Sequence, residues 1–186
     1  MTYKVNEYVR ALTISFKTDK KGNKVKRDHK LVEGIAIHGT GNKGDTAINN
    51  MIFFAMNNKG PNAREAGAHF FVDRYGMICK SIPMDAIAFS VGDNLKQGDG
   101  AATYYGMLGN ENTVSIELCD IADKDPSPEQ IGAVKWLITY IQKYCPNAKK
   151  IVRHYDISGK ICPNRMAGTP TAEKRWKKFL KAVKPE

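Results

Sequence analysis

Short apolar segments with the character of buried strands alternate along this chain with segments of helical periodicity. The segments that we expect to form strands are residues 34–38, 68–73, 77–82, 113–119 and 150–153. Helices are expected at residues 45–58, 128–144 and from 169 onward. Elements in this order bury their apolar sides best as a sheet covered by helices. We therefore predict an α/β fold with a mixed central β-sheet flanked by helices, in a single layered domain of residues 1–186.

The sheet is expected to be mixed because two of these strands are joined by a tight turn. Residues 68–73 and 77–82 flank a turn that contains Gly76, which is typical of an antiparallel hairpin. A weaker hairpin is expected near the N-terminus. There, residues 11–16 alternate weakly, and residues 24–29 could return as the second strand after a polar turn.

Two further segments have patterns that bear on the fold. The helix expected at residues 45–58 has one apolar side, which consists of Ile48, Ile52, Phe53 and Met56. Residues 92–110 form a long glycine-rich loop. Loops of this length inside a compact domain are usually functional or mobile, so this loop is a candidate for a functional role.

Positive charge is the main compositional feature, with a formal net charge of +10 concentrated in residues 17–30 and 174–184. Such a surface favours anionic partners such as nucleic acids, membranes or cell-wall polymers, or simply keeps the protein in solution. The basic runs lack interleaved aromatic residues and a nucleic-acid-binding motif, so we expect no nucleic-acid partner. No apolar run is long enough to span a bilayer, so we expect no membrane insertion. Residues 1–10 do not resemble a secretory signal, which predicts synthesis in a cytoplasm without a signal peptide. We also expect a monomer.

The chain has four cysteines, Cys79, Cys119, Cys145 and Cys162, and no pair of them has the spacing of a CxxC motif. The count would permit two disulfides, but the irregular spacing and the expected cytoplasmic synthesis argue against them. Cys79 and Cys119 lie in apolar segments, and we expect them to be free, buried thiols. Cys162 differs because of its neighbours.

Residues 154–163 combine an imidazole, an ammonium group and a thiol, from His154, Lys160 and Cys162. Histidine and cysteine are good protein ligands for zinc. In an extended segment, Lys160 and Cys162 would point the same way, because they are two residues apart. A cation beside a structural zinc would repel it, whereas a cation beside a catalytic zinc can stabilise negative charge that develops in the reaction. The segment therefore predicts half of a catalytic zinc site.

His38 is our candidate for a third metal ligand, since a catalytic zinc usually has three protein ligands and leaves the fourth position to water. It ends a short apolar strand in which Ile35 and Ile37 share one face, so its side chain should point to the other face. Ligands gather at the carboxyl ends of such strands. A structural role for His38 is the alternative. His29 is expected on the surface, and His69 is either a hydrogen-bonded core histidine or a residue of the cleft.

Glu117 is our candidate for the general base. It lies in an apolar strand segment, on the face opposite Val114 and Ile116. A single carboxylate there is costly to bury unless it is paired or functional. A glutamate satisfied by a salt bridge is one alternative. Asp120, at the end of the same segment, is the competing base, but we expect it to be solvated.

Together these residues resemble the zinc-dependent N-acetylmuramoyl-L-alanine amidases, a family that includes amidase-type phage lysozymes and the peptidoglycan recognition proteins. The resemblance extends from about Gly34 to Pro163. It is strongest in residues 37–40, 68–73, 82–83, 114–118 and 153–163. Its most specific element is the spacing of His154, Lys160 and Cys162, and the order of the blocks adds further weight.

The resemblance implies that His38, His154 and Cys162 hold Zn²⁺, that Glu117 is the general base and that Lys160 stabilises the oxyanion. It implies hydrolysis of the amide between N-acetylmuramic acid and L-alanine in bacterial peptidoglycan. A phage or prophage endolysin, made in the host cytoplasm and acting at the cell wall, would fit this pattern. The alternative is a peptidoglycan-binding module without activity. Cys162 argues against it, because such relatives usually lack the cysteine.

Thr40, His69 and Ser90 are the residues for which we predict contacts with the substrate. Two departures from the family pattern affect this expectation. Ala68 stands where some members have a tyrosine, so this chain would depend on Glu117 alone. Ser90 stands where many members have a histidine, which alters the predicted cleft.

Overall fold

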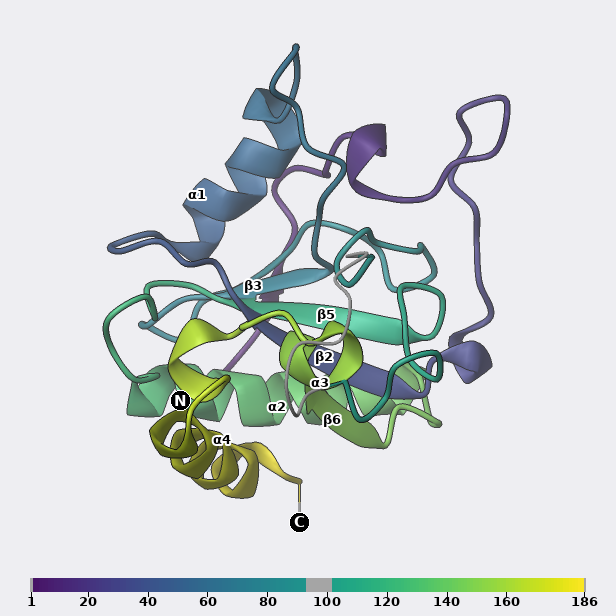
Figure 1. Cartoon of the computed structure of the whole chain (residues 1–186). Helices are drawn as coiled ribbons and strands as arrows, with labels where there is room; N and C mark the ends of the chain where they lie inside the picture. The colour runs from purple at the N-terminus through teal and green to yellow at the C-terminus, as the bar shows by residue number, and fades with distance from the viewer. Residues whose placement is uncertain (1, 93–101, 186) are drawn as a thin grey trace.

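Within residues 2–92 and 102–185, which the computed structural model describes, six strands form one sheet in the order β1-β4-β3-β5-β2-β6 (Figure 1). The strands are β1 (Val5–Asn6), β2 (Gly34–Gly39), β3 (Phe70–Val72), β4 (Ile78–Lys80), β5 (Thr113–Leu118) and β6 (Lys150–Arg153). The β3–β4 pair is the predicted antiparallel hairpin, and the other neighbouring pairs are parallel. The predicted mixed sheet is confirmed.

The three predicted helices begin close to the expected residues, because each of their starts has a side-chain cap, and a further short helix was not predicted. They are α1 (Ala47–Ile52), α2 (Pro128–Tyr144), α3 (His154–Ser158) and α4 (Pro170–Val183). Thr46, Ser127 and Thr169 accept hydrogen bonds from backbone N–H groups in the first turns of α1, α2 and α4. A π-helical turn, η3 (Phe53–Asn57), extends α1 to the predicted end of this helix. Short 3₁₀ turns occur at η1 (Thr13–Ser15), η2 (His29–Leu31) and η4 (Asn164–Met166).

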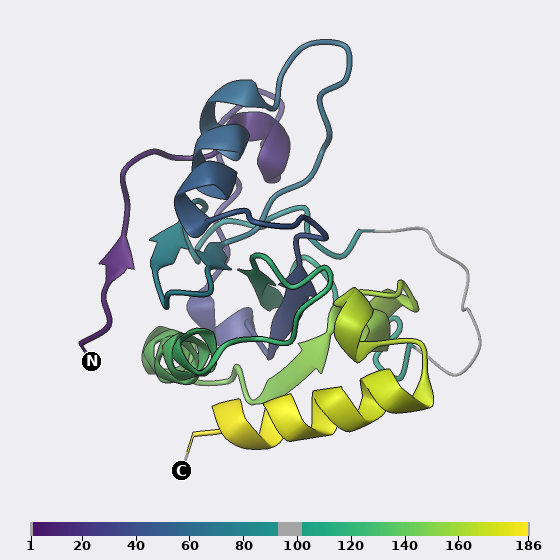
Figure 2. The ribbon, with the colours of Figure 1, turned by 90° about the vertical axis from the view of Figure 1, so that its left-hand side faces the viewer.

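One face of the sheet is covered by α2 and α4, which lie on the side opposite α1 in Figures 1 and 2. Its core contains alternate strand residues such as Ile35 and Ile37 of β2 and Ile116 of β5. The inner sides of the two helices complete it, with Trp176 and Phe179 contributed by α4. The apolar faces predicted for β2 and β5 are therefore confirmed.

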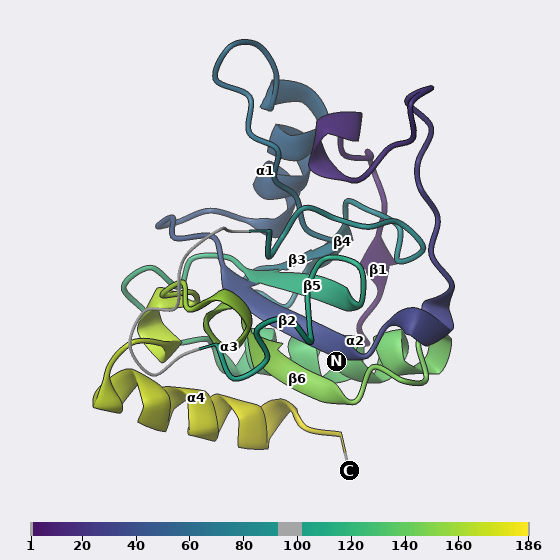
Figure 3. The same cartoon turned by 45° about the vertical axis from the view of Figure 1, so that its right-hand side comes forward.

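The opposite face of the sheet is covered at its two sides by different elements. Ala47 and Met51 of α1 pack against Phe71 of β3 and two buried thiols. Ile157 of α3 packs against Ala36 of β2, and Figure 3 shows α3 beside β2 and β6. The carboxyl ends of β2 and β5 lie between these two packed regions. This arrangement leaves the polar side chains of that face accessible from one end of the sheet.

The hairpin predicted near the N-terminus is wrong beyond its turn. Residues 11–16 contain the 3₁₀ turn η1, and the pairing across the polar turn is a single bridge between Thr18 and Lys24. The backbone of the second segment instead binds residues that follow β4. Arg27 N–H donates to the carbonyl of Asp85. A tertiary contact therefore outweighs the local pattern.

The apolar side predicted for the first helix is confirmed at Ile48, which packs against a buried cluster, and is wrong for the other three residues. Met51 is fully buried, whereas the side chains of Ile52, Phe53 and Met56 are exposed. The π-helical turn changes the residues per turn, so that the 3.6-residue period no longer applies after Ile52. The two-residue β1 is an element that the sequence did not predict, because it is too short to show a period.

Three remaining expectations are settled or lie outside the structure. All four cysteines are free and buried, as predicted for Cys79 and Cys119. Residues 93–101 of the predicted glycine-rich loop lie outside the described residues. Among the described helices, none has the length and apolar character required to cross a bilayer.

Candidate metal centre and active site

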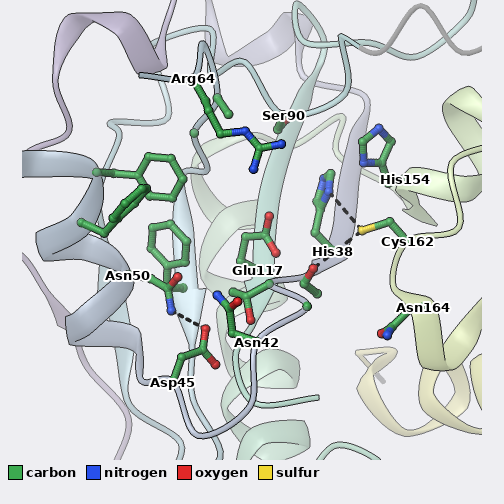
Figure 4. A pocket seen from close by; sticks show the side chains of 18 of the residues that line it. His38, Asn42, Asp45, Asn50, Arg64, Ser90, Glu117, His154, Cys162 and Asn164 are labelled. Atoms are coloured by element: carbon green, nitrogen blue, oxygen red, sulfur yellow. Dashed lines mark hydrogen bonds between the residues drawn. The ribbon is translucent and has the colours of Figure 1, made fainter. Parts of the chain in front are cut away.

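A cavity of about 710 Å³ opens at the carboxyl ends of β2 and β5 (Figure 4). Its walls come from these strands, from α1 and η3, from the loop before β3 and from the segment after α3. The predicted site residues on its walls are His38, Thr40, Ser90, Glu117, His154, Lys160 and Cys162. Segments far apart in the sequence therefore meet in one place, and it is the place where a parallel sheet is expected to bind ligands.

His38, His154 and Cys162 form a buried cluster in this cavity. Each offers one ligand atom, and these atoms lie within 4.8 Å of one another. The distance between His38 Nδ1 and Cys162 Sγ is 3.9 Å, and the two imidazole rings lie 4.7 Å apart between centroids. His38 Nε2 is buried and has no hydrogen-bond partner among residues 2–92 and 102–185. This set of donors could hold a metal ion, and two imidazoles with one thiolate suit zinc.

The sheet brings the two histidines together. β2 and β6 are parallel, and Ile37 pairs with Arg153, so His38 and His154 follow at the ends of adjacent strands. Burial, followed by the charges of His154 and Lys160, holds the pKa of His38 well below its usual range. The His38 ring is therefore neutral, as a metal ligand must be.

Cys162 reaches the cluster through a compact return of the chain, and Lys160 and Cys162 both line the cavity. Residues from His154 form the helix α3, and Gly159 ends it in the left-handed conformation, with φ 84°. The N–H of Tyr155 then donates to the carbonyl of Cys162 at 3.0 Å. Gly39 lies beside this return, where an added Cβ would lie 3.4 Å from Pro163 Cβ and 2.8 Å from Ile121 Cδ1.

Glu117 lies beside His38, because these two residues are paired in the parallel β2–β5 ladder. Its side chain faces the cavity, and its Oε2 atom is buried with no hydrogen-bond partner in the described chain. Burial raises the pKa of Glu117 to about 8, while Lys160 lowers it and Asp45 raises it further. A carboxyl group with a pKa in this range can both accept and return a proton near neutral pH.

Asp120, the competing base, is engaged elsewhere. Its Oδ1 accepts a hydrogen bond from Gly44 N–H at 2.7 Å, and its carboxylate forms an ion pair with Lys124 at 3.0 Å. Arg74 lies 3.7 Å away on the same carboxylate. These contacts hold the pKa of Asp120 below its usual range. Asp120 is absent from the cavity wall within the described residues and has a structural role at the end of β5.

Lys160, Thr40 and Ser90 complete the predicted part of the wall. Lys160 is exposed, and its charge lowers the pKa values of both His38 and Glu117. The hydroxyl oxygens of Thr40 and Ser90 are buried without a hydrogen-bond partner among the described residues. Because both residues line the cavity, these hydroxyls are available to a bound molecule. Their contacts with substrate stay a prediction.

His69 lies behind the cavity rather than on its wall. It is fully buried, and its ring contacts Arg27 Nη2 at 3.1 Å and Ser115 Oγ at 2.9 Å. Burial, followed by the charge of Arg27, lowers the pKa of His69 to about 3. A contact of His69 with substrate remains a prediction, and its position favours the core histidine that the sequence left as the alternative.

Another part of the cavity wall consists of residues that the sequence did not single out as site residues. They are Asp45, Asn49, Asn50, Phe53, Phe54, Arg64 and Ala66. Asp45 accepts hydrogen bonds from Asn50 Nδ2 at 2.7 Å and from the N–H of Asp120. The apolar period of the first helix predicted that Phe53 lies on the inner side of the helix, and it did not predict a position on a cavity wall. No comparable signal marks Arg64, which lies in a polar loop.

Sheet, cavity and buried His–His–Cys cluster together define an α/β protein with a candidate metal centre at the carboxyl ends of its parallel strands. A model of the N-acetylmuramoyl-L-alanine amidase family matches residues 27–165, and the chain belongs to this family. It is 29% identical over 136 residues to the N-acetylmuramoyl-L-alanine amidase CwlL of Bacillus licheniformis. That match covers 71% of this chain and 36% of CwlL, so the chain spans about a third of this relative's length.

Solved structures share the fold. The structure of PlyL aligns with a TM-score of 0.66 and 22% identity, over 100% of this chain and 98% of PlyL. A mutant endolysin from Bacillus subtilis aligns with a TM-score of 0.64 and 19% identity, over 98% of this chain and 100% of the endolysin. The arrangement of sheet and helices is therefore that of known members of this fold.

Proposed function

We propose that this chain hydrolyses the amide bond between N-acetylmuramic acid and L-alanine in bacterial peptidoglycan. The observation that carries the proposal is the buried cluster of His38, His154 and Cys162, with Glu117 and Lys160 on the walls of the same cavity. Membership of the amidase family supports the choice of bond. The presence of Cys162 in the cluster favours catalysis over binding alone.

We infer that the ion held by this cluster is Zn²⁺. A thiolate and two neutral imidazoles suit zinc better than a hard cation such as Mg²⁺. When bound, zinc supplies a Lewis acid that polarises the amide carbonyl and makes water more acidic. Proton transfer and further stabilisation of the carbonyl oxygen depend on the side chains that border the cluster.

Glu117 is placed to move the proton. Its carboxylate takes a proton from the attacking water as the new C–O bond forms at the amide carbon. The same group then passes the proton to the departing nitrogen as the C–N bond breaks, which leaves a carboxylic acid and the free amine of L-alanine. Lys160, whose charge already acts on Glu117 and His38, stabilises negative charge on the carbonyl oxygen.

A cell-wall assay tests the whole proposal. Purified peptidoglycan should lose turbidity and release the amine of L-alanine when the protein is added. Treatment with a chelator should abolish both signals, and added Zn²⁺ should restore them. Binding to the wall without release of any amine would contradict the proposal and indicate a recognition module instead.

Lys160→Ala is expected to keep the metal and to reduce kcat on the order of a hundredfold, because one stabiliser of the oxyanion is removed. Kinetics on a muramyl peptide, together with the zinc content of the purified variant, would measure both effects. Lys177→Ala, which removes an exposed lysine on α4 away from the cavity, is the matched control. Unchanged kcat in Lys160→Ala would remove this residue from the mechanism.

We further propose that the protein acts at the bacterial cell wall as a phage or prophage endolysin made in the host cytoplasm. The fold that it shares with an endolysin from Bacillus subtilis supports this role. The positive net charge of +10 also suits an anionic cell wall.

A further inference from the structure

Arg64 contributes a cation to the cavity that the chemistry described above does not use. It lies in the loop between η3 and β3 and lines the cavity. Figure 4 shows its guanidinium group pointing into the cavity from the side opposite Cys162, above Glu117. Within the described residues the guanidinium has no hydrogen bond or ion pair, so its donors are open to a bound molecule.

A buried asparagine holds the backbone of Arg64 in place. Asn58 is 2% exposed, its Nδ2 donates to the carbonyl of Arg64 at 2.8 Å, and its Oδ1 accepts from the N–H of Arg64 at 2.9 Å. Gly67 N–H donates to the carbonyl of Phe89 at 3.0 Å, which fixes the same loop to the wall that contains Ser90. The loop is therefore held by amide groups, and the charge of Arg64 is not needed to hold it.

The two cations of the cavity have different surroundings. Lys160 comes from the segment after α3 and lines the cavity two residues before the candidate metal ligand Cys162, so it belongs to the part of the cavity where the amide is proposed to react. Arg64 comes from a different segment of the wall, the loop between η3 and β3. A guanidinium is a planar group whose paired N–H donors match a carboxylate better than a single developing oxyanion. Arg64 therefore fits an anionic group of the substrate that lies away from the scissile bond.

In peptidoglycan, such anionic groups lie on one side of the scissile amide. The sugar, the lactyl amide and the first L-alanine are neutral at that position, whereas the next residue of the stem peptide has either a free carboxylate or its amide. We propose that Arg64 binds this carboxylate and selects stem peptides in which it is free. The inference rests on the proposed amidase function. Binding of the carboxylate by Arg64 also orients the substrate, so that the stem peptide lies along the wall formed by α1 and η3.

Two matched muramyl peptides test the inference, one with D-glutamate as the second residue and one with its α-amide, D-isoglutamine. The wild-type protein should favour the free acid by about tenfold to a hundredfold in kcat/KM, mainly through KM, because a charge-assisted hydrogen bond is gained. Arg64→Gln should remove this preference by lowering kcat/KM on the free acid to the value measured on the amide. Arg64→Lys should retain part of it. Lys59→Gln, which removes an exposed charge from the same loop outside the cavity, should behave as wild type.

The possible outcomes separate this inference from the proposed function. If the wild type cleaves both peptides equally well, or Arg64→Gln keeps the preference, Arg64 does not select the carboxylate. If Arg64→Gln instead lowers kcat equally on both peptides, the residue has a different role and the inference is also wrong. If the wild type releases no L-alanine amine from either peptide or from peptidoglycan, the proposed function itself fails. Thermal unfolding of each variant confirms that the comparison is made between folded proteins.

Discussion

Glu117→Gln is expected to retain zinc and to lose turnover by about 10²- to 10⁴-fold, the usual contribution of a general base. Glutamine has nearly the same size as glutamate, so the β5 strand and the neighbouring ligand His38 should be undisturbed. It cannot accept the proton of the attacking water, however. Single-turnover kinetics on a muramyl peptide, combined with metal analysis of the same sample, would measure both quantities.

Glu33→Gln provides the control for this variant. Glu33 is exposed and pairs with Lys150 at 2.8 Å, away from the cavity, so the same loss of charge should have little effect. Wild-type activity in Glu117→Gln would refute its assignment as the base and turn attention to Asp45. That carboxylate also lines the cavity, but it already accepts hydrogen bonds from Asn50 and Asp120.

Cys162→Ser is expected to lose both the bound metal and turnover. Its effect on metal content should therefore be larger than that of Glu117→Gln. Serine has the same shape, but its hydroxyl is a poor zinc ligand because it remains protonated near neutral pH. Two imidazoles would remain, which is fewer than a catalytic zinc normally requires. Zinc measured after dialysis should fall well below one ion per chain, and amine release should be indistinguishable from the reaction without enzyme.

Cys145→Ala is the matched control for the loss of a buried thiol. Cys145 is in the core beside α2 and is not part of the cavity wall, so its removal should leave zinc and activity in place. Circular dichroism would establish that both variants fold. If folded Cys162→Ser retains one tightly bound zinc ion, the metal is held elsewhere and the site has been misassigned.

The strands and most helices could be predicted because their signals are local. Alternation along β2 and β5 identifies which side chains face the core, and capping residues mark the starts of α1, α2 and α4. The helix α3 could not be predicted in this way. It has five residues and depends on Gly159 and on the contact between Tyr155 and Cys162, which forms only when the chain returns.

One half of the candidate site was accessible from the sequence and the other was not. His38 and Glu117 follow from strand alternation, because adjacent positions of a strand face opposite sides. Arg64 and Asp45 are in segments without such a period. The position of Arg64 depends on the hydrogen bonds from Asn58, a buried polar contact that becomes visible only in three dimensions.

The parallel register between β2 and β5 links packing and chemistry in a way that affects how this protein can be engineered. A shift by one residue would move Glu117 into the core and Ile116 into the cavity. Neither strand can therefore be redesigned without loss of both the core packing and the carboxylate of the cavity. The loop that contains Arg64 is anchored through amide groups, and within the described part of the chain its residues 59–66 take no part in the strand pairing of the sheet. Libraries aimed at other bacterial walls should therefore vary residues 59–66 and leave the strands unchanged.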